Sequence, residues 1–232
     1  HKVVGVSMVE HVLDVVEHVD CHKKVVVIGH GADEVKKAID HRDVKFVLQS
    51  ETLGTGHAVM QAEEEIPEDG NVIVLYGDTP LINEKSIEKF IKFHEDNDFS
   101  ASVLTTEIDD PTGYGRIIRN EFDKVVAIVE EKDTSVEQKK IKEINSGIYC
   151  FKASELKKSL SKLDNNNNQG EYYLTDVIEI LNREDKTVGA YIVEDDTEIM
   201  GVNSRRQLAQ AERIMQDRIL GELMDKGVTI ID

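Results

Sequence analysis

The hydrophobic positions of this chain follow two alternating patterns. Short apolar runs rich in β-branched residues are separated by amphipathic stretches whose apolar residues recur at helical spacing. Up to residue 106 this alternation predicts a mainly parallel sheet with helices on both faces. The predicted helices are 7–19, 32–39, 57–66 and 84–97, and the predicted strands are 24–28, 44–48, 72–75 and 101–106.

The pattern changes after Asp110. Strand-like segments follow one another with little helical sequence between them, which indicates an antiparallel addition to one side of the sheet. These segments are 116–119, 125–130 and 147–151. The remaining predicted elements are helices at 154–163 and 173–183, a strand at 188–193 and a helix at 204–226.

The last helix has clear start and stop signals. Ser204 and Gln207 form a capping pattern at its start, and Gly227 ends it. It is long for a globular protein, so we expect an arm that reaches another domain.

The charge balance limits the kinds of partner. Acidic residues number 46 and basic residues 28, which gives a formal net charge of −18. The phosphates of nucleic acid bind basic patches and repel acidic surfaces, so an acidic chain argues against a nucleic-acid partner. A phosphate site in this chain must be local, built from backbone amides, a few cations or a metal.

The two cysteines and the hydropathy indicate the compartment. Cys21 and Cys150 show no motif spacing, and Cys150 lies in an apolar run where a buried, inert thiol is expected. No apolar run approaches the length of a membrane span, and no signal peptide is recognisable. We therefore expect a cytoplasmic protein without disulfides and without a membrane partner.

The segment 71–80, NVIVLYGDTP, is the most informative one for chemistry. Its apolar run does not alternate with polar residues and therefore predicts a strand buried on both faces. Asp78 follows directly, at the carboxyl end of the strand, where open α/β sheets bind ligands. A carboxylate there suits a divalent cation that carries phosphates. A turn-forming aspartate before Thr-Pro explains the same residues equally well.

Two glycine-rich loops are further candidates. Segment 49–58, QSETLGTGHA, exposes backbone N–H groups at a helix start, which suits a phosphate or a base edge. Segment 111–116, PTGYGR, is a double-glycine loop. The alternative interpretation of segment 49–58 is a tight connection between a strand and a helix. The alternative interpretation of segment 111–116 is a flexible connection.

Several polar residues are ambiguous by themselves. Asn145 and Asn203 fit turn or cap positions, and Glu130 belongs to a run of charged residues that is equally consistent with a solvent-exposed surface. The histidines lack zinc spacing, and no Ser-His-Asp or Cys-His arrangement stands out. The residues alone therefore indicate an α/β enzyme that binds a phosphorylated ligand with a metal.

Several motifs occur together in one order along the chain. They are LGTGHA at 53–58, YGDTPL at 76–81, DPTGYGRI at 110–117, IVEEKD at 128–133, EINSGIY at 143–149, NQGEYYLTD at 168–176 and GVN at 201–203. In this combination the chain resembles, over its whole length, the uridylyltransferase domain of the bifunctional bacterial N-acetylglucosamine-1-phosphate uridylyltransferase/glucosamine-1-phosphate acetyltransferase family. The resemblance implies a nucleotide-diphospho-sugar transferase fold, a three-layer α/β/α sandwich with a mixed, mainly parallel sheet.

The resemblance also implies the reaction and the residues. UMP passes from UTP to N-acetylglucosamine 1-phosphate, giving UDP-N-acetylglucosamine and pyrophosphate for peptidoglycan precursor synthesis. Asp78 and Asn203 match the catalytic residues that hold Mg²⁺. The positions that match substrate contacts are Gln49, Gly54 and Thr55 for uridine, Tyr76 and Gly77 for nucleotide and sugar, Gly115, Glu130 and Asn145 for N-acetylglucosamine, and Tyr173 and Thr175 for the sugar pocket.

The family pattern extends beyond both ends of the given sequence. It begins with a strand and the phosphate-binding loop L-A-A-G-x-G-T-R-M before the position of His1, and it continues into an acetyltransferase β-helix. We therefore expect an N-terminally incomplete nucleotidyltransferase domain over 1–202 and, over 203–232, a helical arm leading toward the absent β-helix domain. The missing strand is central to the family's sheet.

The parts of the family pattern that the given sequence does not include lead to expectations for the chain as given. It should bind UTP poorly, be inactive in uridylyl and acetyl transfer, and be a monomer or weak dimer, whereas full-length family members form homotrimers. The alternatives for its function are thymidylyl or adenylyl transfer to a sugar phosphate and a non-catalytic nucleotide-sugar-binding domain.

Overall fold

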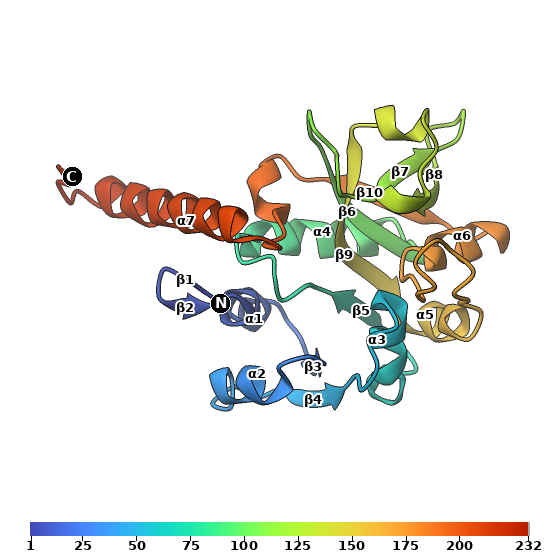
Figure 1. The fold of residues 1–232 in the computed structure, drawn as a ribbon, viewed down its shortest axis with the longest axis horizontal. Helices are drawn as coiled ribbons and strands as arrows, with labels where there is room; N and C mark the ends of the chain where they lie inside the picture. The colour runs from blue at the N-terminus through green and yellow to red at the C-terminus, as the bar shows by residue number, and fades with distance from the viewer. Residues whose placement is uncertain (232) are drawn as a thin grey trace.

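The centre of the molecule is a six-stranded mixed sheet, seen in a computed structural model that describes residues 1–231 (Figure 1). Its path runs β10–β6–β9–β7–β8, and β5 pairs with β9 beside that path. The strands are β5 (Asn71–Val74), β6 (Ala101–Glu107), β7 (Arg116–Arg119), β8 (Val125–Val129), β9 (Glu143–Lys152) and β10 (Val188–Ile192). Because β5, β6 and β7 all run antiparallel to β9, and β10 runs parallel to β6, most strands share one direction.

Helices cover both faces of this sheet, so the predicted three-layer sandwich is confirmed. One apolar cluster joins the sheet to α1 (Met8–His18) and α4 (Glu84–Asp96), for example through Val15 and Phe90. The other cluster joins the opposite face to α3 (Thr55–Gln61), α5 (Ala153–Leu160) and α6 (Asp176–Arg183), for example through Val59, Leu156 and Ile178.

The position of β9 corrects one prediction. Segment 147–151 was expected within an addition at the side of the sheet, but β9 lies between β6 and the pair β5 and β7. Its residues explain why, because successive side chains enter opposite apolar clusters. Ile148 and Cys150 pack on one face, and Tyr149 and Phe151 pack on the other. A strand that is apolar on both faces is most stable in the interior of a sheet. Only β7 and β8 form the lateral addition.

A second, smaller sheet lies near the N-terminal part of the chain. In it β3 (Val25–Ile28) and β4 (Lys45–Leu48) pair in parallel, and α2 (Ala32–Ala38) connects them. Within residues 1–231 no ladder joins this sheet to the six-stranded one. The further central strand implied by the resemblance stays a prediction.

The other boundaries agree closely with the sequence pattern. Each predicted helix and strand is present, although α3 ends at Gln61 and a 3-10 turn continues to Glu65. The pattern missed a short hairpin, β1 (Lys2–Val3) with β2 (Val6–Ser7). The 3-10 turns are η1 (Glu63–Glu65), η2 (Glu131–Asp133), η3 (Gln138–Lys140) and η4 (Asp196–Ile199).

The last helix, α7 (Arg205–Asp225), projects away from the body of the molecule (Figure 1). The Ser204 hydroxyl accepts a hydrogen bond from the Gln207 N–H (3.2 Å), and Gly227 has a φ of +89°, so both predicted ends are confirmed. Ala211 is fully buried, whereas the distal Leu223 is 38% exposed. No helix within residues 1–231 is both long and apolar enough to cross a membrane.

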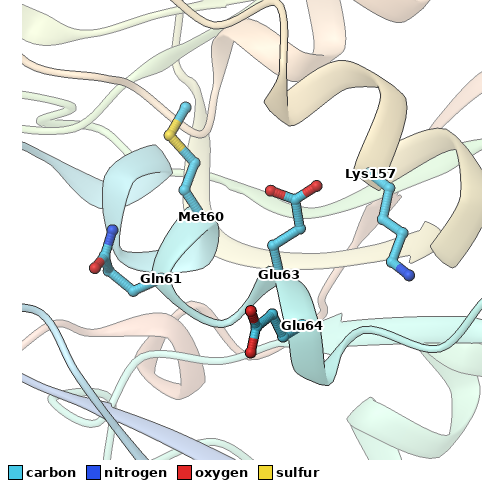
Figure 2. Close-up of a pocket in the computed structure, with 5 residues that line it drawn as sticks. All are labelled: Met60, Gln61, Glu63, Glu64 and Lys157. Atoms are coloured by element: carbon cyan, nitrogen blue, oxygen red, sulfur yellow. The ribbon is translucent and has the colours of Figure 1, made fainter.

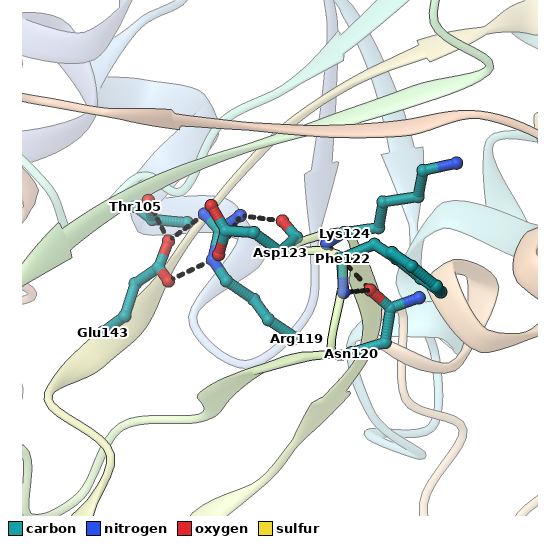
Figure 3. Close-up of polar contacts among 7 residues, drawn as sticks. All are labelled: Thr105, Arg119, Asn120, Phe122, Asp123, Lys124 and Glu143. Atoms are coloured by element: carbon teal, nitrogen blue, oxygen red, sulfur yellow. Dashed lines mark hydrogen bonds and ion pairs between the residues drawn. The ribbon is translucent and has the colours of Figure 1, made fainter.

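A buried carboxylate fixes the lateral hairpin to the central strands (Figure 3). Glu143 on β9 accepts hydrogen bonds from the Thr105 hydroxyl on β6 (2.9 Å) and from Nε and Nη2 of Arg119 on β7 (2.7 and 2.8 Å). Asn120 closes the β7–β8 turn by accepting the N–H groups of Phe122 and Lys124, each at 3.0 Å. The Glu143 side chain therefore links three strands, β6, β7 and β9.

We expect Glu143→Ala to lower the free energy of unfolding by about 3 kcal/mol, because it leaves Arg119 without its buried partner. Chemical denaturation measures this change. The control is Glu137→Ala, which breaks a solvent-exposed pair with Lys140 and should cost about 0.5 kcal/mol or less. Equal losses in the two variants would contradict the structural role given to Glu143.

Candidate functional site

The segment after β5 lies beside the segment that precedes α7. The Val202 N–H donates to the Asp78 carbonyl oxygen (2.9 Å), which holds the two segments together. A Cβ added to Gly201 would stand 3.3 Å from Asn203 Nδ2 and 3.9 Å from Asp78 Oδ2. The side chains of Asp78 and Asn203 therefore both lie close to Gly201, although 125 positions of the sequence separate them.

This pair fits a divalent cation. Burial raises the pKa of Asp78, and no cationic side chain within residues 1–231 counters the shift. A partly desolvated carboxylate beside an amide is a donor set suited to a hard cation that keeps waters and substrate phosphates as its other ligands. Residues 1–231 contain no group of three or more His, Cys, Asp or Glu side chains able to hold a metal, so an all-protein cage of that kind is excluded there.

A second group of polar residues lies where two strands share one edge of β9. β5 pairs with β9 from residue 149 onward, and β7 pairs at Ile144, so neither of them pairs with residues 145–148. The Tyr76 ring covers this break, because a Cβ on Gly147 would stand 2.0 Å from it. Gly147 also has a φ of +82°, and its N–H donates to Asn145 Oδ1 (2.9 Å).

Glu130 and Gly115 complete this group. A Cβ on Gly115 would lie 3.5 Å from both Asn145 Cβ and Glu130 Oε2, so the three residues surround one small space. The Thr175 hydroxyl donates to Glu130 Oε1 (3.3 Å). Burial raises the pKa of Glu130, and the Thr175 hydrogen bond partly offsets that rise. The arrangement offers a carboxylate and an amide to the hydroxyl groups of a ligand.

The glycine loop before α3 forms a third part of the site. Gln49 Nε2 donates to the Gly54 carbonyl oxygen (3.1 Å), and the Leu174 N–H donates to the Thr55 hydroxyl (3.1 Å). Gly54 packs so tightly that an added Cβ would stand 2.5 Å from the Tyr172 carbonyl oxygen. The Thr55 hydroxyl also lies beside the Tyr76 phenol, whose pKa is raised by burial and lowered slightly by this contact.

The remaining predicted residues take different positions. Gly77 is exposed between Tyr76 and Asp78. Thr175 is buried and contacts Glu130 directly, whereas Tyr173 has partners in the neighbouring loops. The Tyr173 hydroxyl donates to Asp133 Oδ2 (3.2 Å) and accepts from Gln169 Nε2 (2.7 Å). Its role in a sugar pocket stays a prediction.

The sequence reasoning overlooked Arg116. This side chain is 1% exposed, its Nη2 lies 2.8 Å from Glu131 Oε2, and it donates to the Tyr114 carbonyl oxygen. It therefore connects the loop of Gly115 to the turn that follows Glu130. A basic residue at the start of the apolar strand β7 was the available signal.

A surface hollow lies away from these groups (Figure 2). It is lined by Met60, Gln61, Glu63, Glu64 and Lys157. None of the predicted site residues lines it, and its walls mix acidic, basic and apolar side chains without a convergent polar set. We assign it no function.

Comparison with known sequences gives a consistent result. The profile of the nucleotidyl transferase family, described as "Nucleotidyl transferase", matches residues 2–198. Proteins named "Bifunctional protein GlmU" are 53% identical over 232 residues in Alkaliphilus metalliredigens, 51% over 233 in Acetivibrio thermocellus and 47% over 232 in Clostridioides difficile. Each comparison covers 100% of this chain but only 51%, 50% and 50% of the relative. The chain thus spans about half the length of these curated relatives.

Solved structures share the fold at low sequence identity. One is a UDP-glucose pyrophosphorylase complexed with UDP-glucose, with a TM-score of 0.70 and 16% identity over 91% of this chain and 87% of that one. Another is a putative glucose-1-phosphate thymidylyltransferase from Bacillus anthracis, with a TM-score of 0.68 and 18% identity over 90% of this chain and 82% of that one. These likenesses establish the α/β fold.

The close approach at Gly147 leads to a prediction about stability. Gly147→Ala should destabilise the protein by more than Gly70→Ala, since both residues have positive φ but only the first meets a side chain. The Gly70 variant should cost about 1–2 kcal/mol, the penalty of a left-handed conformation for an L-residue. Thermal unfolding of both variants measures the difference. Equal costs would mean that the Tyr76 ring moves aside freely.

Proposed function

This chain belongs to the nucleotidyl transferase family, and we propose that its domain transfers UMP from UTP to N-acetylglucosamine 1-phosphate. The observation that carries the proposal is the meeting of three groups at one edge of the sheet. Asp78 and Asn203 form a cation-binding pair, Glu130 and Asn145 form a polar sugar site, and the loop of Gly54 and Thr55 is joined to both through Tyr76. The sequence identity of 53% and 51% with two of the named relatives supports the same activity.

The proposed reaction is a single displacement at phosphorus. An oxygen of the sugar phosphate forms a bond to the α-phosphorus of UTP, and the bond from that phosphorus to the bridging oxygen of pyrophosphate breaks. No covalent enzyme intermediate is needed, so the protein acts mainly by positioning and by neutralising charge. A bound Mg²⁺ would be held by Asp78 and Asn203 and would neutralise charge on the phosphates.

The roles of the other residues follow from their free hydrogen-bonding atoms. The amide nitrogen of Gln49 is engaged by Gly54, so its amide oxygen is the atom left to accept the N3–H of a uracil ring. Tyr76 contacts Thr55 of this loop, and Gly77 joins Tyr76 to Asp78 of the cation-binding pair. Gly115, Glu130 and Asn145, supported by Thr175, face the sugar, and Tyr173 anchors the adjoining loop.

Competition between nucleotides distinguishes this function from its alternatives. UTP, dTTP and ATP should be offered separately with N-acetylglucosamine 1-phosphate and with glucose 1-phosphate, using the whole protein that carries this sequence. Pyrophosphate release should require UTP and should be strongest with the N-acetylated sugar, because a polar site rejects ligands that leave its groups unpaired. Binding without release would favour a non-catalytic nucleotide-sugar-binding domain.

The assembly and location remain part of the proposal. The resemblance predicts a cytoplasmic protein. It also predicts a trimer for the full-length form and a monomer or weak dimer for the chain given. Light scattering of the chain and of the whole protein measures the two states.

Replacing Asp78 tests the proposed magnesium site in two ways. Asp78→Asn should reduce turnover by at least about 10²–10³-fold, the usual cost of removing one preorganised electrostatic group. The midpoint of thermal unfolding should rise with Mg²⁺ in the wild type but not in this variant. Asp109→Asn, which changes a fully exposed carboxylate, should behave like the wild type in both measurements. A variant at Asp78 with normal turnover at saturating Mg²⁺ would remove this residue from the mechanism.

The raised pKa of Glu130 leads to a pH-dependent prediction. Protonation as the pH falls through this raised pKa removes the negative acceptor, so the KM for the sugar phosphate should rise on the acid side. Glu130→Gln should have a high sugar KM that does not change over the same pH range, while the KM for UTP changes less. Parallel pH profiles of sugar KM in the wild type and the variant would contradict the assignment.

A further inference from the structure

Tyr149 has a buried hydroxyl that the folded core does not use. The residue is 0% exposed on β9, and its ring stacks on Phe151 with 5.4 Å between ring centroids. Its hydroxyl oxygen makes no hydrogen bond of normal geometry within residues 1–231, although the Asn145 side chain lies near enough to lower the pKa of the phenol. A buried hydroxyl without a partner is destabilising. Phenylalanine would fill the same space without that cost.

The backbone of β9 brings this hydroxyl close to the sugar site. Tyr149 pairs with Val103 of β6, and Asn145 pairs with Thr105, so a separation of four residues on β9 lies opposite a separation of two residues on β6. The irregularity brings Asn145 within about 7 Å of strand length from Tyr149, instead of about 13 Å for a regular strand. Ile144 packs in the cluster on one face of the sheet and Tyr149 in the cluster on the other, so Asn145, which follows Ile144, lies on the face of Tyr149.

The groups around the phenol are those of the candidate site. Burial raises the pKa of Tyr149, the nearby Tyr76 and Glu130 add to the rise, and the Asn145 side chain opposes it. Asp176, at the start of α6, is a weaker influence. Three of these four neighbours are residues assigned to the substrate, and the register of β9 brings Asn145 close to Tyr149, so the hydroxyl lies next to the sugar site.

The neighbours have matching hydrogen-bonding atoms. Asn145 uses its Oδ1 to accept the Gly147 N–H, which leaves the two hydrogens on Nδ2 for other acceptors. Glu130 uses its Oε1 to accept the Thr175 hydroxyl, which leaves Oε2 for a further donor. A tyrosine hydroxyl accepts one hydrogen bond and donates another, which is the combination that links an amide to a carboxylate.

We propose that Tyr149 is a positioning residue of the sugar site, whose hydroxyl accepts from Asn145 Nδ2 and donates to Glu130 when the sugar phosphate is bound. The inference rests on the proposed function, because it assigns Asn145 and Glu130 to the sugar. Held in this way, the two side chains present one amide hydrogen and one carboxylate oxygen to the ligand in a fixed geometry. Tyr149 itself stays beneath them and touches no substrate.

Tyr149→Phe removes only the hydroxyl and provides the test. Thermal stability should stay equal or increase, because an unpartnered buried group is removed. The KM for the sugar phosphate should rise about tenfold, as expected for one lost hydrogen bond of about 1.4 kcal/mol. The kcat and the KM for UTP should change by less than twofold. A residue of purely structural importance would not produce a selective rise in one KM together with unchanged or increased stability.

The pH profile gives a second readout. A donor to Glu130 lowers the pKa of that carboxylate, so Tyr149→Phe should move the acid limb of the sugar KM profile to higher pH. The other acids that act on Glu130, Asp133 and Glu171, remain in this variant. The matched control is Tyr191→Phe on β10, where the ring packs against Phe90 and Phe93, and this control should leave both KM values and the pH profile unchanged.

The wild type is assayed first with the panel of nucleotides and sugar phosphates. Absence of UTP-dependent pyrophosphate release there would overturn the proposed function, and Tyr149 would then be tested by its effect on whichever sugar phosphate the protein binds. A Tyr149→Phe variant whose sugar KM and acid limb equal those of an active wild type would overturn the proposal for Tyr149 alone.

Discussion

The burial of β9 on both faces is the constraint on which the other parts of the molecule depend. This strand pairs with β6 along one edge and with β5 and β7 along the other. The segment that contains Asp78 follows the end of β5, and Gly115 directly precedes the start of β7, on the same edge of β9. Anchoring β9 in the core therefore fixes where the two loops meet, and the break between β5 and β7 becomes the floor of the candidate site.

Glycine residues set the shape of this floor, since two of them lie directly beside side chains of the candidate site. The Tyr76 ring occupies the space above Gly147, and the pair Asp78 and Asn203 faces across Gly201. A Cβ at Gly147 would require the Tyr76 ring to move, whereas a Cβ at Gly201 would require only a small shift of the Asn203 side chain.

The electrostatics of the site make the ligand-free protein receptive to a cation and to polar ligands. Burial raises the pKa of Asp78 and of Glu130, and burial together with Glu179 raises the pKa of Asp176 to about 6. Desolvated carboxylates are stabilised when a cation or a hydrogen-bond donor arrives. The acidic balance of the whole chain, with a net charge of −18, makes such local compensation necessary for any phosphate ligand.

The sequence by itself determined the local structure of this protein. Helical spacing, capping residues and buried apolar runs depend on neighbours along the chain, and they predicted each long element, including the start of α7 at Ser204 and its end at Gly227. The run before Asp78 also predicted a strand, which β5 (Asn71–Val74) confirms, whereas a ligand site at Asp78 stays a prediction. Whether its carboxylate served a turn or a cation was left open, because the alternatives share the same local pattern.

Only the tertiary structure decided which distant residues meet. Both an edge and a central position were compatible with the local pattern of segment 147–151, and packing of both faces against helices selected the centre. Asn203 approaches Asp78 beside Gly201, and Glu130 approaches Asn145 beside Gly115, through contacts between segments far apart in sequence. Such contacts depend on the whole balance of buried surface, which no local period of hydrophobic residues encodes.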